Sequence, residues 1–252
     1  MKLNKIYNNC ESKVVPLVFH RIVSKKPQYW EDVQEKTFEK IVEYIKHRYF
    51  ISKNNSVGQN KWLITFDDGN VSDYKVAFPI LLKKKVKAIF FVIVDKIGKP
   101  GYLNWSQIIE MKENGMEIGS HSLCHYSMKS LSLSEVDFEL RKSKSILEDF
   151  LNIQINSFSY PYGDYTRETN KLASEAGYTS IFTSKHGLFN SKDILIPRNS
   201  INASMNFKDV LKVLEAKPQT LISWWIEDNS KLLLKKYVGL KNYKKVRNYI
   251  FK

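Results

Sequence analysis

Three short motifs in this chain supply side chains that can bind a metal ion and move a proton. Residues 65–69 read TFDDG, residues 121–125 read HSLCH, and residues 160–163 read YPYG. One aspartate and two neutral imidazoles form a ligand set that holds zinc or a similar divalent ion and leaves a position for water. A second carboxylate beside that ion can take a proton from the water. Together, the motifs predict metal-assisted hydrolysis of an amide or an ester.

Each motif by itself has a simpler explanation. His121 and His125 are four residues apart, a spacing that places two imidazoles on one face of a helical turn but also arises between unrelated histidines. Likewise, Asp-Asp-Gly after an apolar run is typical of a turn that ends a strand. The combination, and not any one motif, therefore favours a catalytic site.

The combination resembles the polysaccharide deacetylase family, whose members are metal-dependent enzymes acting on chitin, peptidoglycan and related N-acetylated glycans. The resemblance extends over residues 14–201. Residues 88–92, AIFFV, are similar to the ATFFV strand of the family, and residues 114–121, NGMEIGSH, are similar to its NGHEIGSH run. The resemblance implies an α/β fold, a distorted (β/α)7 barrel, whereas periodicity alone fits a doubly wound sheet equally well.

The resemblance also implies roles for individual side chains. Asp67 matches the catalytic base of the family, and Asp68, His121 and His125 match the ligands of Zn²⁺ or another divalent transition metal. The expected reaction removes N-acetyl groups from an amino sugar in a glycan, an oligosaccharide or a lipid-linked precursor. An N-acetylated carbohydrate is therefore the expected partner.

The third motif both matches the family and departs from it. Pro161, Tyr162 and Gly163 match the PYG loop that contacts substrate, and the backbone N–H of Tyr162 would stabilise the oxyanion. Many members have an arginine two residues before the proline to orient the base, but this chain has Ser159 there. We expect Arg198 to replace it, because it follows an apolar run that should end a late strand; a solvated surface arginine is the alternative.

A second departure concerns the proton donor to the leaving amine. The family usually supplies it from a late Leu-x-His motif, and this chain has no histidine after His186. His20 resembles the Tyr-His-Arg motif that opens many members, so we rank it above His186 as the catalytic candidate, with a purely structural histidine as the alternative. If neither histidine is the donor, either another group or water serves, or the protein is a catalytically impaired glycan-binding barrel. Hydrolysis of another non-peptide C–N bond on the same fold is a further alternative.

Alternating apolar runs and helical patterns place these motifs at the ends of strands. The predicted strands cover residues 14–19, 62–66, 88–94, 117–120, 157–160 and 178–183. The predicted helices cover residues 33–47, 75–85, 105–115, 133–151 and 167–176. Asn104 and Ser132 are the expected N-caps of two of these helices. Because α/β folds build their sites at the carboxyl ends of strands, this arrangement agrees with a catalytic site.

Length and charge suggest one catalytic unit with a basic extension. A chain of 252 residues with 43% apolar residues can bury one large core. We expect residues 1–217 to form the catalytic barrel and residues 218–252 a basic, aromatic, helical extension packed on or beside it. The net charge of +14 suggests an anionic partner, such as a membrane surface or a lipid-linked sugar, with a solvated lysine-rich surface as the alternative. Nucleic acid is not the expected anionic partner, because the sequence contains no recognised nucleic-acid-binding motif.

Cysteine usage and the absence of long apolar segments bear on location. Cys10 and Cys124 form no disulfide framework, and Cys124 is either a small filler or a supplementary metal ligand. The first residues lack the apolar core of a secretory signal, and no stretch is long enough to span a bilayer. We therefore expect a cytoplasmic protein, at the inner membrane surface if the basic extension contacts lipid.

Overall fold

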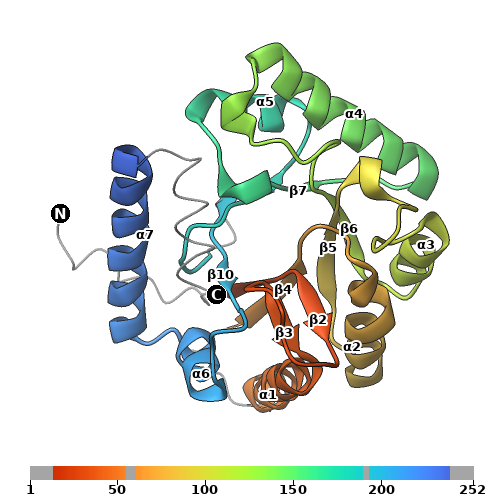
Figure 1. The fold of residues 1–252 in the computed structure, drawn as a ribbon. Helices are drawn as coiled ribbons and strands as arrows, with labels where there is room; N and C mark the ends of the chain where they lie inside the picture. The colour runs from red at the N-terminus through yellow and green to blue at the C-terminus, as the bar shows by residue number, and fades with distance from the viewer. Residues whose placement is uncertain (1–13, 55–60, 190–192, 239–252) are drawn as a thin grey trace.

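Parallel strands form the centre of the computed structural model, and helices surround them (Figure 1). The structure describes residues 14–54, 61–189 and 193–238. The strands are β1 (Val14–Phe19), β2 (Arg21–Val23), β3 (Asp32–Gln34), β4 (Lys61–Phe66), β5 (Ala88–Val92), β6 (Glu117–Ser120), β7 (Ser157–Ser159), β8 (Ser180–Phe182), β9 (Leu195–Ile196) and β10 (Asn199–Ser200). Strands β2 and β3 form a separate two-stranded sheet, and the others form one sheet.

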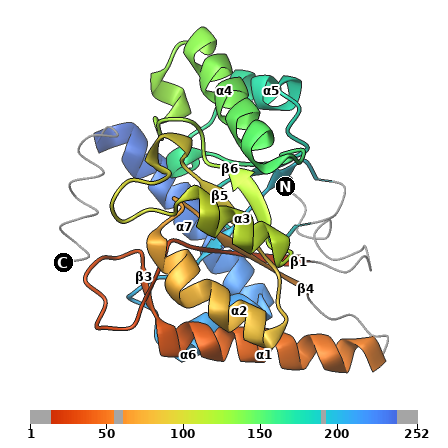
Figure 2. The same cartoon turned by 90° about the vertical axis from the view of Figure 1, so that its right-hand side faces the viewer.

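The helices lie on the outer side of the large sheet. Figure 2, which faces α3, shows several of them in front of the strands. The α-helices are α1 (Glu35–Asn54), α2 (Phe78–Lys84), α3 (Trp105–Glu113), α4 (Leu133–Leu151), α5 (Arg167–Glu175), α6 (Phe207–Glu215) and α7 (Pro218–Val238). A π-helical turn, η2 (Asp73–Ala77), leads into α2, and 3-10 turns form η3 (Val94–Lys96), η4 (Met128–Ser130) and η5 (Pro161–Gly163).

The two edges of the large sheet meet in one short segment. The strand order is β10-β1-β4-β5-β6-β7-β8-β9, and every strand pair in it is parallel. Strand β9 pairs with β8, whereas β10, only two residues further along the chain, pairs with β1. If residues 195–200 count as one strand, the sheet returns to its start with seven strands. The predicted (β/α)7 barrel is thereby confirmed, and the doubly wound alternative is excluded.

Alternate residues of the strands enter two different apolar clusters, because successive side chains of a strand point to opposite faces. In β5, Phe90 and Val92 pack in the large cluster shared with the helices, while Ile89 and Phe91 pack with Phe182 in a small cluster on the other face. All five residues of β5 are buried, as expected for a parallel strand covered on both sides. The small cluster therefore lies inside the curled sheet.

Helix ends agree closely with the capping signals in the sequence. Asn104 accepts a hydrogen bond from the backbone of Gln107, and Ser132 accepts one from Glu135, so both predicted N-caps are confirmed as capping boxes. The helix expected over residues 75–85 instead begins as the π-helical turn η2. Helix α6 and the short strand β10 were not among the predicted elements.

Helix α7 begins at Pro218, next to the predicted domain boundary, and contacts the loop after β8. Trp224 is buried, and its ring stacks on that of His186 with centroids 5.9 Å apart. Asp228 accepts hydrogen bonds from the backbone N–H of His186 at 2.9 Å and from its Nδ1 at 2.8 Å. The division at residue 217 stays a prediction, and part of the predicted extension, residues 239–252, lies outside the described residues. Among the described helices, none is long and apolar enough to cross a bilayer.

Candidate active site

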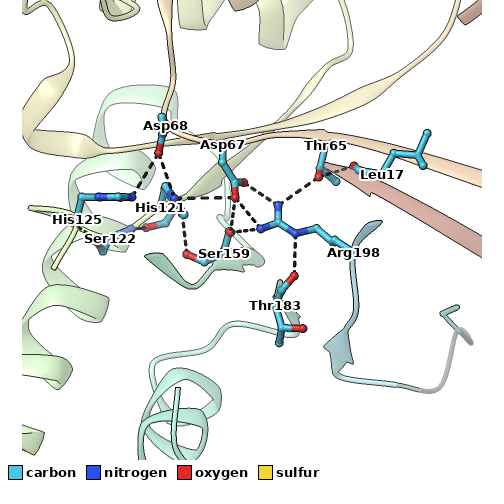
Figure 3. A network of polar contacts seen from close by, with 11 residues as sticks. Leu17, Thr65, Asp67, Asp68, His121, Ser122, His125, Ser159, Thr183 and Arg198 are labelled. Atoms are coloured by element: carbon cyan, nitrogen blue, oxygen red, sulfur yellow. Dashed lines mark hydrogen bonds and ion pairs between the residues drawn. The ribbon is translucent and has the colours of Figure 1, made fainter. Parts of the chain in front are cut away.

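The predicted catalytic and metal-binding residues lie together at the carboxyl ends of the strands (Figure 3). Asp67 and Asp68 directly follow β4, His121 directly follows β6, and Arg198 lies between β9 and β10. Since the strands are parallel, their carboxyl ends share one rim, where α/β barrels place their sites. Residues that are up to 131 positions apart in sequence thus come into hydrogen-bond contact.

Three donor groups converge as a metal site requires. The Oδ1 atom of Asp68 lies 3.4 Å from Nε2 of His121 and 3.3 Å from Nε2 of His125. All three donor atoms lie within 4.8 Å of one another. A tetrahedral zinc ion with bonds of about 2.0–2.1 Å separates its ligand atoms by about 3.4 Å. The Nδ1 atom of His121 lies 2.8 Å from the carbonyl oxygen of Ser159, which fixes the ring with Nε2 facing Asp68. This donor set therefore fits a zinc-like ion.

The two histidines do not lie on a helical turn, so that part of the sequence interpretation is wrong. Residues 121–127 form a loop after β6. Ser122 and His125 have φ values of 67° and 65°, in the left-handed region that is costly for residues with a side chain. These two reversals, and not helical periodicity, bring the imidazoles together. Asp68 and Tyr162 share this backbone conformation, with φ values of 74° and 60°.

Arg198 is buried against Asp67. Its exposed fraction is 1%, and its Nη1 and Nη2 atoms each donate to one oxygen of Asp67 at 2.6 Å. Nη2 also donates to Oγ of Ser159 at 2.7 Å, Nη1 to Oγ1 of Thr65 at 3.2 Å, and Nε to the carbonyl oxygen of Thr183 at 3.1 Å. The surface alternative for Arg198 is thus excluded. The small Ser159, found where many family members have arginine, contacts this guanidinium group from strand β7.

The charges around the two aspartates keep both carboxylates ionised. Burial alone would raise the pKa of Asp67, but Arg198 and His121 outweigh it and hold the pKa below the ordinary 3.8. Burial also opposes ionisation of Asp68, whereas hydrogen bonds from His121 and His125 lower its pKa well below that value. Burial lowers the pKa of His121, yet the two carboxylates raise it overall. An ionised Asp67 next to the metal donors is the protonation state that a general base needs.

Two further ionisable groups lie close to this pair. His20 directly follows β1 and lowers the pKa of both Asp67 and Asp68, so it lies within electrostatic reach of them. Its Nδ1 atom is buried without a hydrogen-bond partner. Asp73 in η2 is fully buried, and neither carboxylate oxygen has a partner. Burial and the negative charge of Asp68 raise the pKa of Asp73 well above 3.8. Sequence patterns missed Asp73 because it precedes the predicted helix.

The PYG motif forms the tight turn η5 beside the metal donors. Tyr162 is 47% exposed, and its ring meets that of His125 edge to face with centroids 4.7 Å apart. Pro161 is buried. Gly163 has a φ of 64°, and a Cβ atom there would lie 2.5 Å from the side chain of Ser184 and 2.9 Å from its backbone nitrogen. Only glycine allows the turn to approach the loop after β8 so closely.

Two residues from the sequence motifs lie outside the donor set. The Sγ atom of Cys124 lies 3.0 Å from Oδ2 of Asp95. Burial and this carboxylate raise the pKa of the Cys124 thiol to about 12, so the sulfur stays protonated and is a poor metal ligand. His186 pairs with Asp228 of α7. His186 therefore takes part in the contact between α7 and the loop after β8.

A curled parallel sheet that carries an Asp-His-His donor set next to a buried aspartate is the arrangement that the resemblance to polysaccharide deacetylases implies. Residues 54–181, about half of the chain, match the sequence model of the family described as Polysaccharide deacetylase. The chain belongs to this family.

Individual relatives agree with this assignment. The Bacillus subtilis protein YxkH, which is named after the same family, is 36% identical over 125 residues, covering 50% of this chain and 45% of YxkH. A Staphylococcus aureus poly-beta-1,6-N-acetyl-D-glucosamine N-deacetylase is 29% identical over 166 residues, covering 60% of this chain and 57% of the relative. The chain thus spans about half the length of these curated relatives.

Solved structures share the fold over most of the chain. The Streptococcus pyogenes deacetylase PplD, solved in complex with acetate, superposes with a TM-score of 0.71 at 25% identity and covers 81% of this chain and 98% of PplD. IcaB from Ammonifex degensii superposes with a TM-score of 0.69 at 22% identity, covering 81% of this chain and 98% of IcaB. At this identity, the likeness to IcaB is evidence for the fold alone.

Proposed function

We propose that this protein is a metal-dependent hydrolase that removes N-acetyl groups from an amino sugar. The observation that carries the proposal is the pairing of two functions at one rim: a converging Asp-His-His donor set and, next to it, a buried carboxylate held by an arginine. A protein that only binds glycans needs neither feature. The membership of the chain in the polysaccharide deacetylase family supports the same reaction.

Asp68, His121 and His125 would hold the ion. When bound, a divalent ion supplies Lewis-acid activation of the attacking water and of the acetyl carbonyl. Nδ1 of His121 is engaged with the carbonyl oxygen of Ser159, which leaves Nε2 for the ion. The short Oδ1 to Nε2 distances mean that the side chains need little rearrangement to bind.

Asp67 is the proposed general base. Its carboxylate lies 4.0 Å from Nε2 of His121, close to the metal donors but not among them. Arg198 and Ser159 hold its two oxygens and keep it ionised until it accepts the proton of the attacking water. Arg198 therefore acts on the reaction through Asp67, as a positioning residue.

His20 and Tyr162 are proposed to act on the other side of the reaction. The half-buried ring of His20, within electrostatic reach of the two aspartates, would protonate the departing amine in place of the missing late histidine. The backbone N–H of Tyr162, in a turn beside His125, would donate to the developing oxyanion. Pro161 and Gly163 fix this turn and would contact the sugar next to it.

The proposed substrate is an N-acetylated amino sugar in a glycan, an oligosaccharide or a lipid-linked precursor. A relative named for deacetylating poly-beta-1,6-N-acetyl-D-glucosamine and a structural neighbour solved with acetate both support an acetyl group on such a sugar. Hydrolysis of another C–N bond on the same fold would be separated from this reaction by a substrate screen.

Metal binding and acetate release test the proposal together. Metal-free protein titrated calorimetrically with Zn²⁺ should bind one ion, and a His121→Ala/His125→Ala double variant should lose that site. Acetate release from N-acetylated glycans should then require metal. In Asp67→Asn, kcat should fall by about 100- to 10,000-fold, because the general base is lost, while the Kd for Zn²⁺ stays nearly unchanged.

Zinc calorimetry and the acetate-release assay test different parts of the proposed function. Loss of zinc binding in Asp67→Asn would assign that carboxylate to coordination instead of proton transfer. Zinc binding without acetate release from any N-acetylated sugar would favour another C–N bond. Absence of a zinc site in the wild-type protein would contradict the enzyme and favour a glycan-binding barrel.

We also propose that α7 mediates peripheral contact with anionic lipid headgroups. Ile222, Trp225 and Ile226 are 54%, 63% and 55% exposed, so this helix presents an apolar surface away from the barrel. In sequence, residues 229–252 contain eight lysines and arginines and no acidic residue. Exposed apolar side chains combined with basic residues are typical of helices that bind at membrane surfaces. The predicted cytoplasmic location stays a prediction.

A further inference from the structure

Residues 121–125, the part of the loop from one histidine to the other, form no helix or strand, yet their backbone N–H groups are all hydrogen-bonded. His121 donates to the carbonyl oxygen of Val92 at 2.9 Å. Ser122 donates to Oγ of Ser120 at 3.2 Å, and His125 donates to Oγ of Ser122 at 2.9 Å. These three bonds use the neighbouring strand β5 and serines next to or within the loop. The two remaining N–H groups, between the histidines, need an acceptor from elsewhere.

That acceptor is one carboxylate oxygen on α4. Oε2 of Glu139 accepts from the N–H of Leu123 at 2.9 Å and from the N–H of Cys124 at 2.9 Å. Glu139 is only 4% exposed. Hydrogen bonds to an ionised acceptor are the stronger ones, so one side chain fixes two successive peptide planes in the centre of the loop.

Glu139 occupies a position of α4 that helical packing would assign to an apolar residue. The buried positions of this helix include Val136, Leu140, Leu147 and Leu151, which recur at the helical period. A carboxylate on such a face is costly unless hydrogen bonds satisfy it. The bonds to the loop provide that compensation, which gives this acid a reason to lie in the core.

The opposite side of the loop contacts η3 through two backbone hydrogen bonds, in addition to the contact of the Cys124 thiol with Asp95. The N–H of Val94 donates to the carbonyl oxygen of Ser122 at 3.2 Å, and that of Asp95 donates to the carbonyl oxygen of Leu123 at 3.0 Å. The loop thus lies between η3 and α4. The backbone N–H groups between the two histidines are those of Leu123 and Cys124. Within the described residues, the side chain that accepts from them is Glu139, which lies outside the loop on α4.

We infer that Glu139 is a positioning residue of the metal site, which sets the geometry of His121 and His125 through the peptide groups between them. The left-handed conformations of Ser122 and His125 raise the energy of this loop, so it keeps its shape only while outside contacts hold it. The inference rests on the proposed metal site, but its structural part, control of the loop by Glu139, can be measured without metal.

Amide hydrogen exchange in metal-free protein and zinc calorimetry test the inference side by side. In Glu139→Ala, the amides of Leu123 and Cys124 should exchange at least about tenfold faster, because both lose their acceptor. The Kd for Zn²⁺ should rise by about 10- to 100-fold, the usual effect of removing a group that orients metal ligands. Glu139→Gln keeps an oxygen acceptor and should restore most of both properties.

Glu148 offers a matched control on the same helix. Its Oε1 atom accepts from the backbone N–H of Ile155 at 2.9 Å, at the end of α4 away from the histidine loop. Glu148→Ala should therefore speed exchange of the Ile155 amide and leave the Kd for Zn²⁺ unchanged. If Glu139→Ala does not fold, Glu139→Met keeps the length and apolar packing of the side chain without the acceptor and takes its place.

The outcomes separate this inference from the proposed function. Unchanged exchange at Leu123 and Cys124 in folded Glu139→Ala or Glu139→Met would overturn the inference, as would faster exchange with an unchanged Kd for Zn²⁺ in the same variant. If the wild-type protein binds no Zn²⁺, the proposed function fails and Glu139 has no metal site to position. The exchange data would then still decide whether Glu139 holds the loop.

Discussion

At the scale of single residues, Arg198 and Asp67 form the most constrained contact of the site. The guanidinium group makes five hydrogen bonds, to Asp67, Ser159, Thr65 and the carbonyl of Thr183, and it lies over the ring of Phe91 at 5.5 Å. An arginine has five N–H donors, so its donor capacity is used in full. Its planar fork holds both carboxylate oxygens at once, which the point charge of lysine cannot do.

Removing this arginine should destabilise the protein and change its pH dependence. Arg198→Ala leaves the carboxylate of Asp67 buried without its cation, which should cost about 3–5 kcal/mol in the free energy of unfolding. Arg198→Lys should cost less, because a charge remains. In both variants the pKa of Asp67 should rise, since burial is then less opposed, and the acidic limb of kcat should move to higher pH. Urea denaturation and a pH profile measure the two effects; unchanged stability would contradict the role of the pair.

Asp73 should make stability fall as pH rises. The folded protein keeps this carboxyl protonated because its pKa lies well above 3.8, whereas the unfolded chain loses the proton near 3.8. The unfolded state therefore gains stability relative to the folded state as pH rises from 3.8 toward the raised pKa. Asp73→Asn removes this titration, so its free energy of unfolding relative to wild type should increase from about pH 4 to about pH 8.

Urea denaturation of metal-free protein at the two pH values provides the measurement for Asp73. A constant packing cost of asparagine lowers the free energy of unfolding equally at both pH values. The test is therefore how the difference between Asp73→Asn and wild type changes from one pH to the other. Asp95→Asn serves as the control, since this aspartate lies outside the sheet in η3. Parallel pH curves for Asp73→Asn and wild type would show that Asp73 is ionised in the folded protein.

At the scale of elements, the sequence predicts most strands because their apolar runs and flanking turns are local signals. Strands β1 and β6 have the predicted limits, and the capping boxes of α3 and α4 begin those helices where expected. By contrast, β10 contains two residues and exists through its pairing with β1, near the other end of the chain. Local periodicity carries no information about such pairing.

In the candidate site, too, the sequence predicts what local motifs determine and not what tertiary contacts determine. Asp67, Asp68, His121 and His125 lie in contiguous motifs, so the sequence identifies them without the fold. The conformation of the histidine loop could not be predicted, because it depends on Glu139 and on backbone groups from η3. Spacing alone suggested a helical turn there, and tertiary contacts gave another conformation.

Helix α7 should depend for its position on the contact of Asp228 with the loop after β8. Asp228 holds the loop after β8 through the backbone and the ring of His186. In Asp228→Ala, we expect faster hydrogen exchange along α7, measured by mass spectrometry, with an unchanged Kd for Zn²⁺ because the metal donors lie on other elements. Gln219→Ala, at an exposed position near the start of the same helix, is the control. Unchanged exchange along α7 would instead assign its docking to the buried Trp224.

At the scale of the whole molecule, charge and exposed apolar surface predict salt-sensitive membrane contact. A protein of net charge +14 should sediment with vesicles containing anionic lipid but not with neutral vesicles, and high salt should release it. Ile222→Ser/Trp225→Ser/Ile226→Ser should weaken sedimentation at unchanged charge. Leu82→Ser, an exposed apolar residue on α2, should not. Equal binding of the triple variant would assign the effect to charge alone.

The closure of the barrel has a consequence for the order in which the protein is made. A ribosome has already produced all the metal donors when it reaches residue 125, but the arginine that holds the base arrives with residues 195–200. The same short segment joins the two edges of the sheet. Completion of the barrel and positioning of Asp67 are therefore one event, and under the proposed mechanism a nascent chain that already carries Asp68, His121 and His125 lacks a positioned base until residues 195–200 are in place.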